Sequence, residues 1–143
     1  MDISVVIPLL NEQESLTELH HWISSVMKSN GFSYEILFID DGSTDGTPSI
    51  LSKYNQVDVV ENGVNVGQSR SRNSGIDRAL GDYICFLDAD DYFVHDNVLS
   101  QWINLSPSSD MIKAANVVNG NFDRPSHFFT ESELGLFSSL NEA

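Results

Sequence analysis

Short runs of apolar residues alternate along the chain with segments whose apolar residues recur every three or four positions. The runs at residues 3–7 and 34–39 are rich in β-branched and aromatic side chains, which is typical of buried parallel strands. We predict that Asn11 caps the helix between them, that Glu14 completes a capping box, and that the helix ends at Asn30 and Gly31. Its apolar residues recur at helical spacing: Leu16, Leu19, Ile23, Val26 and Met27.

The same alternation continues toward the C-terminus. Further strands are predicted at residues 57–60, 83–87 and 111–118, and further helices at 68–80 and 94–103. A short helix capped by Thr47 or Ser49 is predicted between the second and third strands, with Pro48 in its first turn. This order of elements predicts βαβ units around a mostly parallel sheet. We expect one domain over residues 1–118 and a tail over 119–143, in which residues 131–140 are a candidate helix.

On the predicted helix at residues 68–80, one face carries Ser69, Arg72, Asn73, Ile76 and Leu80. Burial of Arg72 on that face requires an acidic or phosphate partner. Two interpretations of Arg72 stay open from the sequence alone: a contact to a bound ligand, or a salt bridge at the rim of the sheet.

Composition narrows the classes of function. The chain has 143 residues with 41% hydrophobic and 20% charged, which is enough for one globular domain with a core. Its net charge of -14 argues against nucleic acid or an anionic membrane surface as the main partner. The single cysteine, Cys85, lies in an apolar run and predicts a reducing compartment. With no membrane-length apolar run and no signal peptide, we expect a cytoplasmic protein, with peripheral attachment to the inner face of the membrane as an alternative.

Polar residues follow three of the predicted strands at the point where each strand ends. These segments are residues 8–12, 40–43 and 88–91. Ligands of open α/β sheets bind outside the carboxyl ends of the strands, so we expect the three segments to meet at one ligand site.

The acidic segment after the strand at residues 83–87 holds Asp88, Asp90 and Asp91 within four positions. Neighbouring carboxylates raise the cost of ionising one another, so such a cluster needs either full solvation or a cation. Taken alone, it is more often a solvated loop. At the end of a buried strand, it also suits Mg²⁺ or Mn²⁺, which take one or two carboxylates and complete their shell with water and phosphate oxygens.

The segment DDGSTDGT begins like a calcium-binding EF-hand loop, but its twelfth position is Ser52 instead of Glu, and a strand precedes it. For Ser43, Thr44 and Asp45 the favoured interpretation is a turn that caps the following helix. We expect Asp40 or Asp41, at the strand end itself, to have a binding role.

Three stretches in this order and spacing, SVVIPLLNEQESL, EILFIDDGSTDGT and VGQSRSRNSGIDRALGDYICFLDADDYF, resemble the family 2 glycosyltransferases of the GT-A fold. The resemblance covers roughly residues 3–102. It implies a Rossmann-like three-layer α/β/α sandwich that binds a nucleoside-diphosphate sugar, UDP- or GDP-linked, and transfers the sugar to a glycan or lipid-linked acceptor with inversion. The biological context it implies is the synthesis of polysaccharide, glycolipid or cell-envelope glycan.

The resemblance also implies roles for individual residues. Pro8, Leu10, Asn11 and Glu12 would belong to the first nucleotide-contacting loop, and Asp41 would hold the base. Arg72 would lie near the nucleotide. Asp88 would contact the ribose or the metal shell, and Asp90 would bind Mn²⁺ or Mg²⁺ through the D-x-D motif, with Asp91 in support.

The chain departs from the family pattern in two ways. Leu10 stands where many members have an aromatic residue that stacks on the base. Members also continue well past this length into an acceptor-binding half with a general base, so the chain looks truncated after the donor-binding half and the catalytic base is unknown. A binding domain without its own turnover is therefore the alternative function, and a partner subunit or a homo-oligomer stays open. A phosphoryl-transfer receiver is disfavoured because Lys113 falls inside a predicted strand.

Overall fold

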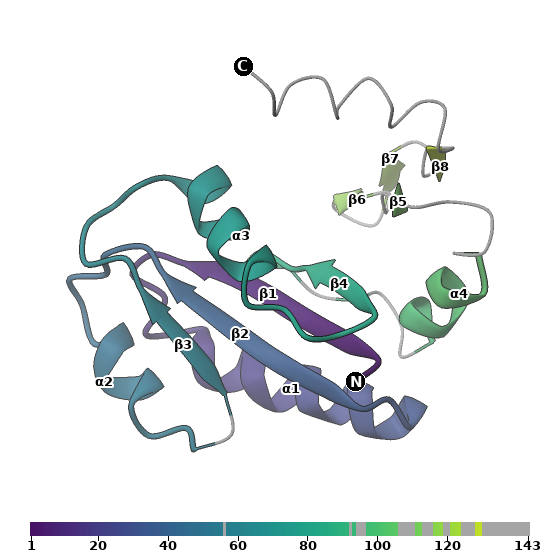
Figure 1. Cartoon of the computed structure of the whole chain (residues 1–143), viewed down its shortest axis with the longest axis horizontal. Helices are drawn as coiled ribbons and strands as arrows, with labels where there is room; N and C mark the ends of the chain where they lie inside the picture. The colour runs from purple at the N-terminus through teal and green to yellow at the C-terminus, as the bar shows by residue number, and fades with distance from the viewer. Residues whose placement is uncertain are drawn as a thin grey trace. The chain divides into compact units, whose positions relative to one another are not determined.

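Four parallel strands form the central sheet, in the order β3-β2-β1-β4. In this computed structural model, β1 is Ile3–Leu9, β2 is Tyr34–Asp40, β3 is Asp58–Glu61 and β4 is Tyr83–Phe86 (Figure 1). Within the sheet, the two central strands carry most of the buried apolar side chains, as their uninterrupted apolar sequence predicts. The predicted parallel α/β sheet is confirmed.

The structure describes residues 1–55, 57–91, 93, 97–105, 111–112, 116–118, 121–123 and 128–129. The chain divides into two units, Met1–Tyr92 and Phe93–Ala143, each with its own internal contacts. The sheet and its helices belong to the first unit. The predicted domain over residues 1–118 stays a prediction.

Strand β1 runs two residues further than expected, through Pro8 to Leu9. Proline donates no hydrogen bond and is normally excluded from central strands. In the described sheet, β4 pairs with β1 only from Ile3 to Val6, so beyond Val6 the strand has a partner on one side only. That one-sided position tolerates the missing N–H of Pro8.

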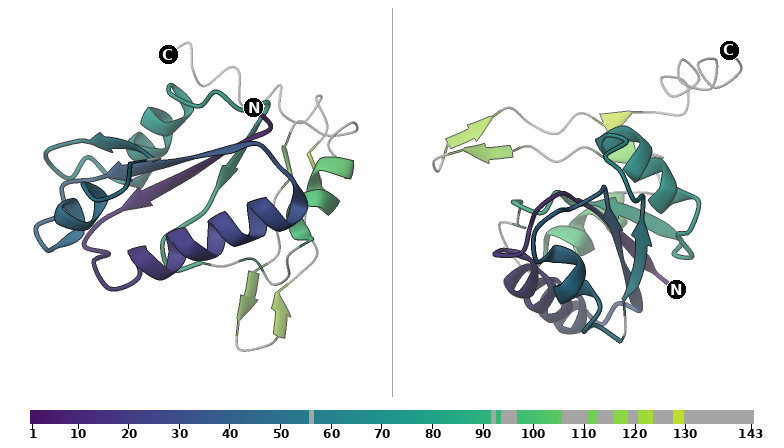
Figure 2. Two further views of the ribbon diagram at one scale, coloured as in Figure 1. Left: turned by 90° about the horizontal axis from the view of Figure 1, so that it is seen from below. Right: turned by 90° about the vertical axis from the view of Figure 1, so that its left-hand side faces the viewer.

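Helices cover both faces of the sheet (Figures 1 and 2). α1 (Leu16–Asn30) and α2 (Thr47–Leu51) lie on one face, and α3 (Gln68–Ile76) lies on the other. α1 buries the five apolar residues predicted from their helical spacing, and it ends at Gly31, whose φ of 73° is the left-handed conformation that glycine adopts readily. The three-layer α/β/α arrangement is confirmed.

The predicted caps of the first two helices were wrong, whereas α3 begins at Gln68 as predicted. α1 begins at Leu16 after Ser15, and no side chain caps it, so Asn11 and Glu14 form no capping box. Asn11 instead turns away with a φ of 60° and bonds to the loop after β2. The residue that precedes α2 is Gly46, neither Thr47 nor Ser49, although Pro48 occupies the first turn as expected.

Helix α3 packs on the sheet through small residues and not through the predicted face. Its buried residues are Ser71 and Gly75, whereas Ile76 is 45% exposed and Leu80, beyond the helix end, is 73% exposed. A Cβ on Gly75 would lie 2.2 Å from Val6 Cγ1, far inside van der Waals contact. The absence of a side chain at residue 75 therefore sets how closely α3 approaches β1.

Strand β4 was predicted to be buried, but in the described part of the chain it lies at an edge of the sheet. Tyr83, Ile84 and Phe86 are each about two-fifths exposed, and Cys85 is the buried residue of the strand. Burial raises the pKa of the Cys85 thiol to about 12. An apolar run indicates a strand, but its sequence does not say whether both faces are covered.

In the second unit the structure describes α4 (Val98–Leu105) and two antiparallel strand pairs. β5 (Met111–Ile112) pairs with β8 (Phe128–Phe129), and β6 (Asn116–Val118) pairs with β7 (Asn121–Asp123). The single strand predicted over 111–118 is therefore two short ones, with residues 113–115 outside the described residues. Residues 94–96 of the predicted helix and the candidate helix at 131–140 also lie outside them. Among the described helices, none is long and apolar enough to cross a membrane.

We expect Gly75→Ala to destabilise the fold by about 1–3 kcal/mol, the usual cost of overpacking a tight core contact. Alanine favours a helix over glycine by about 1 kcal/mol, so a net loss shows that the steric contact with Val6 dominates. Urea unfolding measures the difference. Ser69→Ala, at an exposed position of the same helix, is the control and should change stability by less than about 0.5 kcal/mol. Equal stability of Gly75→Ala and the wild type would contradict this account.

Candidate functional site

The carboxyl ends of the strands meet at one rim of the sheet. Leu9 pairs with Asp40 and Asp40 pairs with Glu61, so the loops after β1, β2 and β3 leave from the same edge. Leu87 donates its N–H to the Val6 carbonyl, 3.1 Å away, so the acidic segment leaves from that edge too. A pocket of about 530 Å³ opens there, lined by Pro8, Leu9, Leu10, Glu12, Asp41, Asn65, Gly67, Gln68, Asp88, Ala89 and Asp90.

Most of the site residues predicted from the sequence line this pocket: Pro8, Leu10, Glu12, Asp41, Asp88 and Asp90. Asn11 and Arg72 are not among the lining residues, but each bonds to a neighbour in the rim. The sequence reasoning missed Asn65, Gly67 and Gln68, which follow β3. The signal that could have found them is the Asn-Gly turn at Asn62, since a fourth strand end on the same edge brings its loop to the same place.

Asp41 is the most tightly bonded side chain of the site and is only 5% exposed. Its Oδ1 accepts hydrogen bonds from the Val66 N–H and from Asn62 Nδ2, both at 2.9 Å, and its Oδ2 accepts the Gly67 N–H at 2.9 Å. Burial by itself raises the pKa of Asp41, but the bonds from Val66, Asn62, Ser71 and Gly67 outweigh it and hold the pKa below the ordinary value. Asp41 is therefore a carboxylate that fixes the loop after β3.

The loop after β3 also lies so close to the loop after β2 that no side chain fits between them at residue 42. Gly42 has a φ of 85°, and a Cβ there would lie 2.8 Å from the Asn65 backbone nitrogen. Glycine is thus required at this position on two grounds, conformation and space. Asn62 extends the connection, because its Nδ2 also donates to Ser71 Oγ in α3 at 3.0 Å.

Asp88 is held by two side chains of α3. Arg72 Nη2 donates to Asp88 Oδ1 at 2.7 Å, and Gln68 Nε2 donates to the same oxygen at 3.1 Å. The Arg72 guanidinium also lies 6.0 Å from the centre of the Phe86 ring. Of the two interpretations of Arg72, the structure shows the salt bridge at the rim. Both donors use Oδ1 of Asp88, and Arg72 Nε is buried without a hydrogen-bond partner in the described structure.

Asp90 and Asp91 are exposed in the same segment, and Asp90 lines the pocket. Desolvation, followed by the negative charges of Asp88 and Asp90, raises the pKa of Asp91. Within the described ranges, no three His, Cys, Asp or Glu side chains gather as a complete metal cage. The donor set, one or two carboxylates beside an open pocket, fits Mg²⁺ or Mn²⁺, which retain positions for water and phosphate oxygens. It does not fit a structural zinc site, which surrounds the metal with four protein ligands.

The segment Ser43 to Asp45 has the turn contacts expected from the sequence. The Ser43 N–H donates to Asp40 Oδ1 at 2.9 Å, and the Thr47 N–H donates to Asp45 Oδ1 at 2.9 Å. The first bond closes the turn after β2, and the second satisfies the backbone N–H of the first residue of α2. Residues 43–45 therefore have a structural role in the rim.

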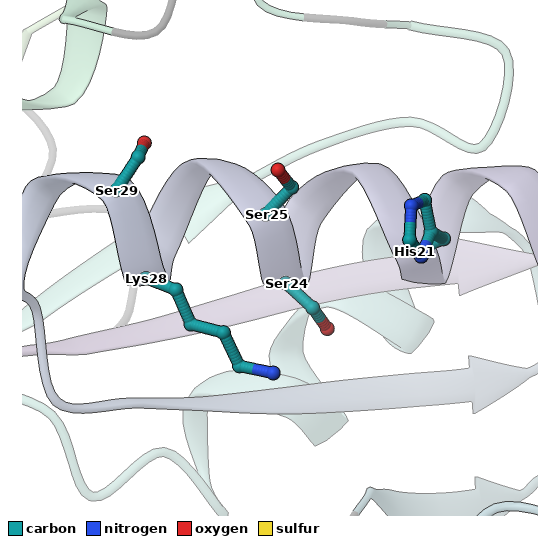
Figure 3. Close-up of a pocket in the computed structure, with 5 residues that line it drawn as sticks. All are labelled: His21, Ser24, Ser25, Lys28 and Ser29. Carbon is teal, nitrogen blue, oxygen red and sulfur yellow. The ribbon is translucent and has the colours of Figure 1, made fainter.

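A second hollow, of about 490 Å³, lies along the outer side of α1 and is lined by His21, Ser24, Ser25, Lys28 and Ser29. Figure 3 shows these side chains spread along the helix, without a common point toward which they converge. They contain no carboxylate and lie on none of the loops at the carboxyl ends of the strands. The pocket at the rim is therefore the candidate site.

The comparison with known proteins agrees with this geometry. The sequence profile described as glycosyl transferase family 2 matches residues 4–132. The chain belongs to this family. It is 39% identical over 112 residues to the poly(ribitol-phosphate) beta-glucosyltransferase of Bacillus spizizenii, an alignment that covers 74% of the chain.

Solved structures are also similar to the chain. TarS of S. aureus, residues 1–349 in complex with UDP-GlcNAc, is similar with a TM-score of 0.66 and 29% identity over 87% of the chain. A mannosyltransferase from Pyrobaculum calidifontis, in complex with GDP-Man and Mn²⁺, shares the fold with a TM-score of 0.64 and 24% identity over 75% of the chain. The chain spans 17% of the length of the Bacillus relative, 37% of the TarS structure and 33% of the mannosyltransferase.

The bonds to Asp41 predict how stability depends on pH. Because its pKa in the folded chain lies below the ordinary value of 3.8, ionised Asp41 stabilises the fold fully above about pH 4, and this contribution is lost as the pH falls through the folded pKa. Asp41→Asn replaces one accepting oxygen with an amide group that faces a donor. We expect it to cost about 1–3 kcal/mol at pH 7, the penalty for an unsatisfied buried donor.

Urea unfolding of the wild type and Asp41→Asn between pH 7 and pH 2.5 measures this difference. The gap between the two proteins should narrow below about pH 4, because only the wild type loses an ionised carboxylate at this position. Asp2, whose pKa is lowered by hydrogen bonds from Ser33, contributes equally to both proteins and cancels in the comparison. A gap that stays constant over the whole range would show that the charge of Asp41 does not stabilise the fold.

Proposed function

We propose that the protein is a glycosyltransferase that binds a nucleoside-diphosphate sugar in the rim pocket and transfers the sugar, with inversion, to an acceptor of cell-envelope glycan synthesis. The observation that carries the proposal is the pocket itself, which joins the Asp41 loop to the Asp88-Ala89-Asp90 segment in one space. Family membership and the similarity to TarS with bound UDP-GlcNAc support a nucleotide-sugar donor, linked to UDP or GDP.

The two walls of the pocket suit the two ends of such a donor. The wall formed by Leu10, Asp41 and Asn65 offers an apolar side chain beside polar groups, which suits a nucleobase. Asp41 already accepts three hydrogen bonds, so we infer that its main part in base binding is to hold the loop that carries Asn65 and Gly67. The acidic wall, with Asp88 and Asp90, would face the ribose and the diphosphate.

A divalent cation, Mn²⁺ or Mg²⁺, completes the proposed site. Asp90 is its proposed ligand and Asp88 its second contact, with the Oδ1 of Asp88 held in place by Arg72 and Gln68. The cation would neutralise the charge of the diphosphate leaving group. The Mn²⁺ in the mannosyltransferase from Pyrobaculum calidifontis supports this assignment through the shared fold alone.

Inversion requires a general base that removes the proton of the acceptor hydroxyl as the anomeric carbon is attacked. We assign this role to no residue of the described chain. A second candidate function is donor binding without turnover, which uses the rim pocket but requires no general base. Release of UDP from UDP-GlcNAc in the presence of acceptor separates the two candidates.

Titration calorimetry with UDP, GDP and their sugars tests donor binding. We expect binding of at least one nucleotide in the presence of Mn²⁺ and at least tenfold weaker binding in its absence, as the metal bridges carboxylate and diphosphate. Asp90→Asn should weaken Mn²⁺-dependent binding by a similar factor. Asp58→Asn is the charge-matched control, because Asp58 is exposed at the start of β3, at the opposite end of that strand from the rim.

The outcome of the control decides between a specific site and general electrostatics. Equal effects of the two substitutions would show that net charge governs binding and would remove the assignment of Asp90. The absence of nucleotide binding under every condition would overturn the proposed function.

A further inference from the structure

Two loops of the rim are joined by successive backbone amides of the first loop, residues 10–13. The Asn11 N–H donates to Ser43 Oγ at 2.9 Å, the Glu12 N–H to Thr47 Oγ1 at 2.8 Å, and the Gln13 N–H to Asp45 Oδ2 at 3.3 Å. All three acceptors are side chains of the second loop, residues 43–47.

The second loop donates in return. The Thr44 N–H donates to Asn11 Oδ1 at 2.8 Å, and the Gly46 N–H donates to Gln13 Oε1 at 2.7 Å. A Cβ on Gly46 would lie 2.6 Å from Gln13 Oε1, so the end of the Gln13 side chain packs directly against the Gly46 backbone. We call this reciprocal set of bonds between residues 11–13 and 43–47 the loop clamp.

The clamp holds Asn11 in an unfavourable backbone conformation. Its φ of 60° makes it the non-glycine residue with positive φ among the described residues. Asparagine tolerates this region better than most residues, yet the conformation still has an energetic cost. The bonds from both loops offset that cost, and they set the direction in which the chain leaves β1.

The side chains of the clamp stand outside the pocket, whereas the residues beside them line it. Gln13 and Ser43 are absent from the lining, but Leu10 and Glu12 on the first loop and Asp41 before the second loop are part of it. A change in the clamp therefore alters the spacing between the loops after β1 and β2 without removing a group that faces the pocket.

We propose that Gln13 and Ser43 are positioning residues, which determine donor affinity by locking the loops after β1 and β2, and with them the pocket residues Leu10, Glu12 and Asp41, at a fixed spacing. This inference rests on the proposed function, since it concerns binding of the nucleotide at the same site. It extends that function to residues that touch no part of the donor.

The test uses two variants, one on each loop. Gln13→Met keeps the length of the side chain and removes the acceptor of the Gly46 N–H, and Ser43→Ala removes the acceptor of the Asn11 N–H. Each should weaken Mn²⁺-dependent UDP binding about fivefold in calorimetry, the order of one net hydrogen bond. The double variant should lose less than the product of the two, because both act through the same clamp. Thr17→Val, an exposed change in the first turn of α1, is the control and should bind UDP as the wild type does.

Two further measurements separate positioning from a loss of stability. Urea unfolding establishes that each variant is folded under the binding conditions, and amide hydrogen exchange at Gly46 should be faster in Gln13→Met than in the wild type. If one variant does not fold, the other carries the test. Folded variants with wild-type affinity, or a Thr17→Val variant as weak as the two clamp variants, would overturn the inference. A wild type that binds no nucleotide would overturn the proposed function first, which is a different result.

Discussion

The rim of this sheet depends on the carboxylate of Asp41. Parallel strands bring their ends to one edge but do not determine how the following loops sit against one another. Asp41 makes that connection by accepting two backbone N–H groups and one side-chain amide from the loop after β3. Its own N–H donates to the Leu9 carbonyl at 2.9 Å, so one residue joins the ends of three strands. A buried carboxylate is tolerated there because its oxygens are satisfied.

The rest of the pocket is held together in the same way, by side chains that bond to a backbone N–H or to a carboxylate of another segment. Arg72 and Gln68 reach from α3 to Asp88 on the far side, and the loop clamp joins the segments after β1 and β2. Small residues make the close approaches possible: Gly75 of α3 packs against Val6 of β1, and Gly42 lies between the loops after β2 and β3. The pocket is thus assembled from loop contacts on a rigid sheet, which is a common way for α/β proteins to place a binding site.

The sequence predicted the fold well because its information is local. The apolar runs at β1 and β2 and the helical spacing of α1 identify these elements without knowledge of their partners. Acidic residues at the ends of strands likewise predicted that the loops after these strands meet at one edge of the sheet. What the sequence did not predict depends on contacts between distant residues. Asparagine is a common helix cap, but the side chain of Asn11 accepts a hydrogen bond from the Thr44 N–H instead. The prediction of which face of α3 is buried was wrong because Gly75 packs closely by having no side chain. Hydrophobic periodicity does not detect such a contact.

The buried thiol of Cys85 has a practical consequence for work on this protein. Burial raises its pKa to about 12 and so disfavours the thiolate, which is the form that reacts with maleimides and iodoacetamides. Cys85 also lies in the sheet and not on a rim loop. In the folded chain, Cys85 should therefore react slowly with thiol reagents. A cysteine introduced on an exposed loop gives a single spectroscopic label, and modification of Cys85 itself reports that β4 has opened.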